Sequence, residues 1–354
     1  MKIALLGSTG SIGTNTLEIA QRFGIEMELL VAGNNVELLK EQVERFRPRI
    51  VVSAKPVEVD APIVLSGEEG ILEALERSEA DVVVNALVGF LGLRPTLKAL
   101  ELGKRVALAN KESLVVAGKF IDISKITPID SEHFGLWYLL QTRRAFRRLV
   151  ITASGGAFRE WEIERIKEAT LQEALRHPNW SMGEKITIDS ATMVNKLFEV
   201  LEAYWLFGSK EIDALIEPSS IVHAAVEFVD GSTLLHASRT DMKLPIAYAL
   251  GIEDEPILEP ISLIGSSFRF LPIDVERYPV WWLKESLLAR PELGVVVNAA
   301  NEAAIELFKR GAIRFFELHE RILRAFERFE GVKVESLEDI FGIDEEVRGY
   351  VANM

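Results

Sequence analysis

The chain has 354 residues, of which 48% are hydrophobic and 27% charged, with no cysteine and a formal net charge of −14 at pH 7. This length suits two or three domains, the negative charge argues against general binding of nucleic acids or anionic membranes, and the lack of cysteine excludes disulfides, thiolate metal sites and thioester chemistry. No apolar run approaches the ~18–20 residues that span a bilayer, and the first residues lack a signal-peptide pattern, so we expect a cytoplasmic protein.

Residues 1–130 alternate short apolar runs with helical patterns. Strands are expected at about 2–7, 25–32, 50–53, 81–86 and 104–109, and helices at 14–22, 36–46, 68–78 and 91–102. Strands that alternate with helices at this spacing are typical of a parallel, doubly wound sheet. The sequence therefore predicts an α/β protein that begins with a Rossmann-like dinucleotide-binding domain.

A glycine-rich turn, GSTGSIG at 7–13, follows the first predicted strand and precedes a predicted helix. In this context glycines let the backbone approach a pyrophosphate, which the N–H groups of the helix N-terminus then bind. The alternative is a tight turn that serves packing only. The second strand ends at Ala32-Gly33-Asn34-Asn35 without the acidic residue that binds a ribose 2′-hydroxyl, so NADP is favoured over NAD.

Two polar clusters follow later strands of this domain. Asn110-Lys111-Glu112 stands at the expected carboxyl end of a strand, where sites in open α/β sheets lie, although it also suits an ordinary first helical turn. In Asp130-Ser131-Glu132-His133, two carboxylates two positions apart on extended chain would project to one side.

With a third carboxylate, these two would form an oxygen-ligand site for Mg²⁺ or Mn²⁺. Taken alone, the pattern of Asp130-Ser131-Glu132 favours a helix N-terminus with acidic residues in its first turn. The neighbouring His133 is then expected to have a structural role rather than to bind a metal.

The remainder of the chain has a different pattern. We expect a mixed α/β catalytic domain over 131–251, with strands at 148–153, 185–188, 221–229 and 233–237 and helices at 133–147 and 191–206. Residues 252–280 are rich in proline and turn formers and are predicted to be a linker. A helical domain is predicted over 281–354, with helices at 281–289, 294–310, 315–330 and 335–352.

Residues 154–184 are a candidate lid over a substrate site. The segment opens with Ser154-Gly155-Gly156, a loop suited to an anion, and contains His177 and Trp180. Trp180 could equally be a core aromatic residue, and His177 a turn residue before proline.

The stretch HPNWSMGEKITIDSATMVNKLFE at 177–199 predicts a helix with Asp189 or Ser190 as its cap. Asn195, Lys196 and Glu199 can share one side of that helix. A helix N-terminus with these donors is suited to a phosphate, with a carboxylate one turn deeper. The alternative is a capped amphipathic helix whose polar residues only face water.

Together, GSTGSIG, LANKES, DSEH, SGGAFR, RHPNWSMG and DSATMVNK resemble the 1-deoxy-D-xylulose 5-phosphate reductoisomerase family, in order along the whole chain. The resemblance implies isomerisation of 1-deoxy-D-xylulose 5-phosphate by C–C cleavage and re-formation. Reduction by NADPH to 2-C-methyl-D-erythritol 4-phosphate would follow, in the methylerythritol phosphate route to isoprenoid precursors. The resemblance also implies a divalent metal (Mg, Mn or Co) that acts as Lewis acid and template. It further implies a homodimer.

The same resemblance implies roles for individual residues. Metal ligands would be Asp130, Glu132 and Glu199, the last two counted also as catalytic. The substrate phosphate would be bound by Ser154, Ser190, Asn195 and Lys196, and the carbon skeleton would lie near Lys111, Ser131 and His177. NADPH would contact Thr9, Gly10, Ser11, Ile12, Gly33, Asn34, Asn35, Asn110, Glu112 and Gly183, and the lid would place Trp180 and Met182 over the substrate.

One departure and two alternatives bear on this interpretation. Asn34 stands where family members often have a basic residue, which weakens the implied contact with the 2′-phosphate. A dehydrogenase of the aspartate-semialdehyde type shares the glycine turn but needs a nucleophilic cysteine, which this chain lacks. A non-catalytic NADP sensor would need only residues 1–110 and would leave the acidic and phosphate-binding residues without purpose.

Overall fold

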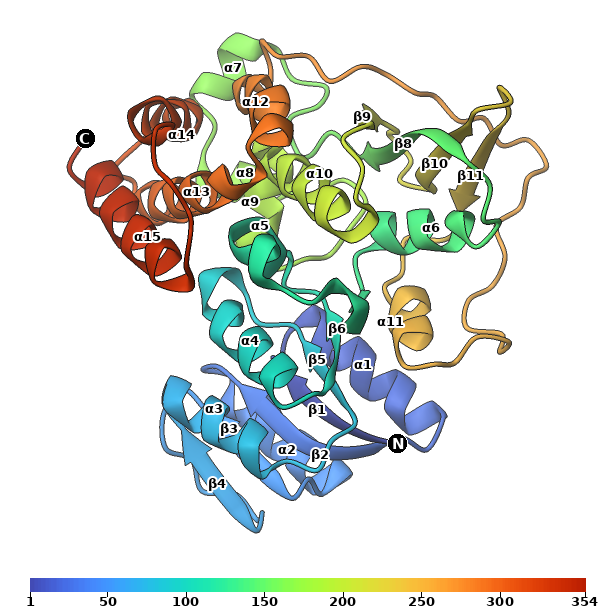
Figure 1. Ribbon diagram of the computed structural model, residues 1–354, viewed down its shortest axis with the longest axis vertical. Helices are drawn as coiled ribbons and strands as arrows, with labels where there is room; N and C mark the ends of the chain where they lie inside the picture. The colour runs from blue at the N-terminus through green and yellow to red at the C-terminus, as the bar shows by residue number, and fades with distance from the viewer. The chain divides into compact units, whose positions relative to one another are not determined.

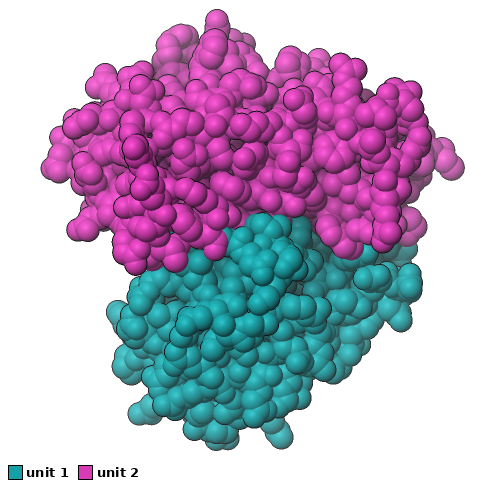
Figure 2. All heavy atoms as spheres, in the orientation of Figure 1, with its two compact units in different colours: residues 1–113, 121–130, 241–259 teal, residues 114–120, 131–240, 260–354 magenta.

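The computed structural model describes residues 1–354 and divides into two units (Figures 1 and 2). Unit 1 comprises residues 1–113, 121–130 and 241–259, and unit 2 comprises residues 114–120, 131–240 and 260–354. The second sheet and the C-terminal helices thus lie in one unit, and 241–259 lies with the N-terminal sheet. The predicted division into three domains and a linker stays a prediction.

Unit 1 is built on a seven-stranded sheet in which every neighbouring pair is parallel, in the order β4-β3-β2-β1-β5-β6-β7. Its central strands are continuous apolar runs, as expected for strands covered by helices on both faces. The strands are β1 (Lys2–Leu6), β2 (Glu26–Ala32), β3 (Ile50–Ser53), β4 (Ile63–Ser66), β5 (Val82–Asn85), β6 (Arg105–Leu108) and β7 (Ile126–Pro128).

The helices of unit 1 follow the predicted alternation. They are α1 (Ser11–Arg22), α2 (Val36–Phe46), α3 (Gly67–Arg77), α4 (Leu93–Glu101) and α11 (Lys243–Ala249), while α5 (Lys111–Ala117) begins in unit 1 and ends in unit 2. The late segment that carries α11 packs on α1, and Ile246 and Ala247 join the core that β1 and α1 form. The predicted parallel α/β architecture is confirmed.

Unit 2 contains a mixed four-stranded sheet in the order β11-β10-β8-β9, parallel only between β8 and β9. Leu136 of α6, Ile151 of β8 and Val200 of α10 share its hydrophobic core. The elements are β8 (Phe146–Ala153), β9 (Ile212–Ile216), β10 (Val222–Phe228), β11 (Thr233–Ala237), α6 (Ser131–Leu140), α7 (Ile163–Lys167), α8 (Leu171–Ala174), α9 (Glu184–Thr192), α10 (Val194–Phe207), α12 (Lys284–Ala289), α13 (Gly294–Lys309), α14 (Phe315–Phe329) and α15 (Leu337–Ala352). Figure 1 shows α14 and α15 beside α13.

The predicted strand at 185–188 is wrong, because these residues lie in helix α9. The expected cap at Asp189 or Ser190 is also wrong, since both lie inside α9 and the next helix begins only at Val194. The isoleucine and threonine residues of KITI (185–188) have an intrinsic preference for strands, but this preference is weak and tertiary packing overrides it. The buried Asp189 accepts hydrogen bonds from Lys185 one turn earlier and from Asn301 of α13, which stabilises the helix.

Smaller differences concern short elements. The sequence patterns missed β4, β7, β9 and α11, and the helix predicted over 133–147 ends at Leu140, with β8 starting at Phe146. Residues 252–278 contain no helix and no strand, as expected for a linker-like segment. No helix in the structure is both long enough and apolar enough to cross a membrane.

Candidate functional site

The glycine turn after β1 contains glycines of two kinds. Gly7 has a φ of +92°, and a Cβ on Gly13 would lie 2.2 Å from the Gly7 carbonyl oxygen, so the turn itself requires both. Gly10 is exposed, has a φ of −82°, and would carry a Cβ 3.5 Å from its nearest neighbour, an ordinary contact. Packing therefore explains Gly7 and Gly13, whereas Gly10 is the glycine whose small size suits a ligand at the N-terminus of α1.

We expect Gly10→Ala and Gly13→Ala to separate these two roles. Gly13→Ala should destabilise the fold by about 1–3 kcal/mol or more, because backbone must move to admit the methyl group. Gly10→Ala should leave the melting temperature unchanged but raise the KM for NADPH. Thermal unfolding and steady-state kinetics measure the two effects, and an unchanged KM for NADPH in Gly10→Ala would remove the dinucleotide role of this turn.

The other predicted cofactor residues of unit 1 lie after β2 and β6. Gly33 and Asn34 are exposed beyond β2, and the Asn35 side chain caps α2 by accepting from the Leu38 N–H. Asn110 is buried and its amide donates to the carbonyl oxygens of Leu87 and Gly89, at 2.9 and 2.8 Å. Asn35 and Asn110 thus have clear structural tasks, and a contact with NADPH would come in addition.

Lys111 and Asp130 form an ion pair in unit 1. The Lys111 ammonium donates to the Asp130 carboxylate at 2.6 Å, and the two side chains are 6% and 11% exposed. Lys111 opens α5 after β6, and Asp130 follows β7, the next strand of the sheet. The carboxyl ends of neighbouring parallel strands therefore bring together two residues that the sequence suggested separately.

In unit 2, two carboxylates converge on one ammonium group. Lys196 Nζ lies 3.0 Å from Glu132 Oε1 and also contacts the Glu199 carboxylate, and the Lys196 and Glu199 side chains are nearly fully buried. Carboxylate oxygens of Glu132 and Glu199 lie within 4.8 Å of each other. Asn195 donates to Glu199 as well, which confirms that these α10 residues share one side.

The geometry expected for Asp130 and Glu132 was wrong in one respect. Glu132 lies in the first turn of α6, which begins at Ser131, rather than on extended chain. The helix N-terminus that the local pattern favoured is therefore correct for this segment. Asp130 directly precedes the helix, so chain connectivity alone keeps its carboxylate close to the start of α6.

His133 has a structural role, as its local pattern indicated. The ring is fully buried, its Nε2 lies 2.8 Å from the Glu199 carbonyl oxygen, and its Nδ1 lies 3.3 Å from Glu202. Because His133 belongs to α6 and both partners belong to α10, the ring fixes the register between the helices that carry Glu132 and Glu199.

Ser154 and His177 meet through a hydrogen bond of 2.8 Å between Oγ and Nε2. The backbone N–H groups of Asn179 and Trp180 donate to His177 Nδ1, at 3.2 and 2.9 Å. A neutral imidazole whose Nδ1 accepts carries its proton on Nε2, so His177 donates to Ser154. Ser154 Oγ also accepts from the Gly156 N–H at 3.0 Å, which leaves its own proton to be donated elsewhere.

His177 stays neutral over the physiological range. Burial, and then the positive charge of Arg159, lower the pKa of His177 from 6.5 to about 4. A histidine whose pKa is lower in the folded state loses stability as the pH falls from about 6.5 towards about 4, because only the unfolded chain gains the proton there. We expect NMR titration to place the His177 transition near pH 4; a transition near 6.5 would contradict the buried geometry.

The loop after β8 packs directly on the last turn of α9. Gly156 has a φ of +68°, and a Cβ there would lie 2.5 Å from the Ser190 carbonyl oxygen. Only glycine allows this approach, which packs the loop that carries Ser154 against the backbone of Ser190. Met193, with a φ of +69°, separates α9 from α10, so Asn195 and Lys196 stand in the first turn of a new helix.

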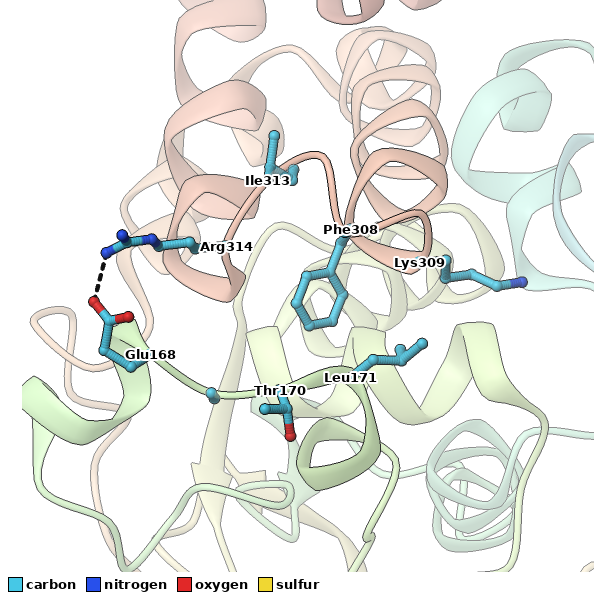
Figure 3. A pocket seen from close by; sticks show the side chains of 9 residues that line it. Glu168, Thr170, Leu171, Phe308, Lys309, Ile313 and Arg314 are labelled. Atoms are coloured by element: carbon cyan, nitrogen blue, oxygen red, sulfur yellow. Dashed lines mark hydrogen bonds and ion pairs between the residues drawn. The ribbon is translucent and has the colours of Figure 1, made fainter.

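A hollow of about 260 Å³ lies elsewhere in unit 2 (Figure 3). Its rim carries the ion pair between Glu168 and Arg314, at 2.6 Å, and its lining includes Phe308 and Leu171. None of the predicted site residues lines it. The hollow is a crevice between the C-terminal helices and the segment before α8.

Comparison with known proteins identifies the family. Models of 1-deoxy-D-xylulose 5-phosphate reductoisomerase match residues 3–118, and models of its C-terminal domains match 126–207 and 237–350. The reductoisomerase of Nautilia profundicola is 58% identical, with 98% of each chain covered, and that of Helicobacter pylori strain 26695 is 50% identical, with 99% of each covered. This chain belongs to the 1-deoxy-D-xylulose 5-phosphate reductoisomerase family.

Solved structures agree with this assignment. A crystal structure of the reductoisomerase in complex with NADPH, fosmidomycin and magnesium matches 100% of this chain and 98% of its own, with 34% identity and a TM-score of 0.91. The Zymomonas mobilis enzyme in complex with NADPH gives 33% identity and a TM-score of 0.88 over 99% and 98% of the two chains. The predicted family and its NADP-dependent oxidoreductase activity are confirmed.

The family motifs also contain residues to which the sequence assigned no role in the site. Asp189 anchors α9 to α13, and Arg159 and Asn179 tie the SGGAFR and RHPNWSMG segments to a turn after β9. Their presence inside recognisable motifs was the available signal. Their partners lie far away in the sequence, so no local pattern could reveal the contacts.

Proposed function

We propose that the residues described above perform the reaction of the family on this chain. That reaction is the NADPH- and divalent-metal-dependent isomerisation and reduction of 1-deoxy-D-xylulose 5-phosphate to 2-C-methyl-D-erythritol 4-phosphate. The observation that carries this assignment of roles is the convergence of two carboxylates, that of the partly buried Glu132 in α6 and that of the buried Glu199 in α10. The first turn of α10 also presents Asn195 and Lys196.

The acidic residues suit a divalent cation. Two carboxylates this close repel each other unless a cation neutralises them, and Lys196 supplies that positive charge in the structure. Hard oxygen donors of this kind are those that Mg²⁺ and Mn²⁺ prefer. Asp130, Glu132 and Glu199 would hold the ion, which when bound supplies Lewis-acid polarisation and a template for the substrate oxygens.

The phosphate of the substrate would be bound by donors from three segments. Ser154 offers the proton that its Oγ does not use within the protein. Ser190, whose backbone packs against Gly156 of the same loop, would add a hydroxyl, and Asn195 and Lys196 an amide and an ammonium group. Lys111, Ser131 and His177 would orient the carbon skeleton. Because the phosphate is remote from the reacting carbons, its binding energy can order the site and exclude water.

NADPH, the reductant of the reaction, would lie along the N-terminus of α1 and the ends of β2 and β6. The backbone N–H groups of the first turn of α1 suit the pyrophosphate. The predicted contacts remain those of the sequence: Thr9, Gly10, Ser11, Ile12, Gly33, Asn34, Asn35, Asn110, Glu112 and Gly183.

The decisive assay follows oxidation of NADPH by 1-deoxy-D-xylulose 5-phosphate with and without divalent metal. We expect oxidation to require both metal and substrate and to stop on chelation, with Mg²⁺, Mn²⁺ and Co²⁺ compared for activity. Oxidation of NADPH that is indifferent to chelation would contradict the metal role of the acidic residues.

We further propose a cytoplasmic homodimer. Strand β11 is an edge strand, and its Leu234 and Leu235 side chains are 41% and 46% exposed, which suits pairing with a second copy. Both NADPH and the sugar phosphate are charged metabolites that do not diffuse across membranes, which suits the cytoplasm. Analytical ultracentrifugation of the wild type and of Leu235→Lys tests the dimer, and the variant should shift towards monomer.

A further inference from the structure

A turn after β9 joins the loop of Ser154 to the segment of His177. The turn spans residues 217–221, between β9 and β10, and its Pro218 carbonyl oxygen accepts two hydrogen bonds. One comes from Arg159 Nη1, at 3.1 Å, and the other from Asn179 Nδ2, at 2.8 Å. Arg159 follows Ser154 by five residues, and Asn179 follows His177 by two, so one acceptor connects the two segments.

The turn is itself rigid. The Glu217 carboxylate is 1% exposed and accepts from the backbone N–H groups of Ser219, Ile221 and Val222, at 2.9, 2.9 and 3.1 Å. Ser220 adopts a φ of +55°, and its hydroxyl accepts a second hydrogen bond from Asn179, at 2.7 Å. A carboxylate that satisfies several backbone donors holds a loop in one conformation.

Arg159 also holds the Ser154 loop directly. Its Nη1 donates to the Ser154 carbonyl oxygen at 2.6 Å, and a Cβ on Gly155 would lie 2.8 Å from the Arg159 side chain. The guanidinium is always charged and presents its donors in a fixed plane, so it can bond both carbonyl oxygens at once. The side chain is 19% exposed, and its Nε forms an ion pair with the exposed Glu160 at 2.8 Å.

We propose that Arg159 is a positioning residue, which together with Asn179 joins the Ser154 loop and the 177–182 segment at the Pro218 carbonyl oxygen and so preassembles the substrate-binding groups Ser154 and His177. The proposal rests on the proposed roles of Ser154 at the substrate phosphate and of His177 at the carbon skeleton. Arg159 itself does not need to touch the substrate. Its effect would be to hold the Ser154 hydroxyl and the His177 imidazole in fixed positions relative to each other before substrate binds.

The test compares Arg159→Met, Arg159→Lys and Asn179→Ala with the exposed control Arg310→Met, at the end of α13. Loss of a charge-assisted hydrogen bond predicts a rise of about tenfold or more in the KM for 1-deoxy-D-xylulose 5-phosphate in Arg159→Met and Asn179→Ala. The KM for NADPH should stay unchanged in both. Arg159→Lys, which keeps the charge, should recover part of the loss, and Arg310→Met should match the wild type.

NMR provides a readout that a merely stabilising residue would not move. The chain has five histidines, so the His177 ring can be assigned with a His177→Gln variant, and its ¹³C and ¹⁵N shifts report the tautomer. In Arg159→Met we expect the ¹⁵N shift of His177 Nε2 to change, because its hydrogen bond to Ser154 Oγ is no longer held in place, while the melting temperature changes little. If the Arg159 variant does not fold, Asn179→Ala carries the same test through the other donor.

Two results would overturn the proposal and differ in meaning. An unchanged substrate KM in Arg159→Met and Asn179→Ala, with a raised KM in His177→Gln, would remove the positioning role and leave the proposed substrate site intact. An unchanged substrate KM in all three variants would remove the proposed role of His177 in the substrate site, and the positioning role with it.

Discussion

Replacing Glu199 by Gln is expected to lower kcat by about a hundredfold to a thousandfold, the scale of several kcal/mol of metal-supplied stabilisation. The change keeps the size of a side chain that is buried against Lys196 and Asn195, but it removes the negative charge a metal ligand needs. NADPH binding, measured by fluorescence titration, should be nearly intact, since the glycine turn and the β2 end supply its predicted contacts.

The matched control is Glu211→Gln, an exposed glutamate before β9 in the same unit. It should behave as the wild type in turnover and in metal titration. The role of Glu199 as a metal ligand would be contradicted if Glu199→Gln bound NADPH poorly but had a normal kcat at saturating NADPH. Raised metal concentration should restore part of the activity only if the remaining ligands still form a site.

Truncating Trp180 to Ala is expected to raise the KM for 1-deoxy-D-xylulose 5-phosphate by about tenfold to a hundredfold, as for a large aromatic contact. Trp180 is only partly buried, and its ring meets His223 of β10 edge-on with centroids 6.2 Å apart. Its backbone N–H donates to His177, so Trp180 adjoins a residue of the proposed substrate site. The KM for NADPH should change much less.

Trp282→Ala is the control for this variant, since Trp282 is 68% exposed and distant in sequence from every predicted site residue. Steady-state kinetics and thermal unfolding of both variants separate a local effect from a global one. An unchanged substrate KM in Trp180→Ala would count against the lid. A large drop in melting temperature would instead favour the alternative of a core aromatic residue.

The sequence was sufficient for the architecture of unit 1. Helix α2 and strand β3 have the predicted bounds, 36–46 and 50–53, because helical periodicity and a short apolar run are local signals. The weak signals were those of short elements, such as β4, whose side chains are only partly buried. The parallel order of the strands followed from their alternation with helices.

The candidate site was predictable only in part. Motif recognition supplied Glu132, Lys196 and Glu199, and the helical spacing of three correctly placed the last two on one side. Propensity failed at α9, where β-branched residues suggested a strand, because burial of Thr187 and Ile188 and the bond from Asn301 to Asp189 outweigh it. Those forces come from residues more than a hundred positions away.

By itself, the sequence determined the α/β class, the family and its reaction, since these rest on local periodicity and on contiguous motifs. Only the tertiary structure decided which glycines of the turn serve packing, and which nitrogen of His177 carries the proton. It also decided how Arg159 and Asn179 meet at one carbonyl oxygen. The reason is physical: hydrogen bonds and close packing join groups by distance in space, and a sequence pattern records only distance along the chain.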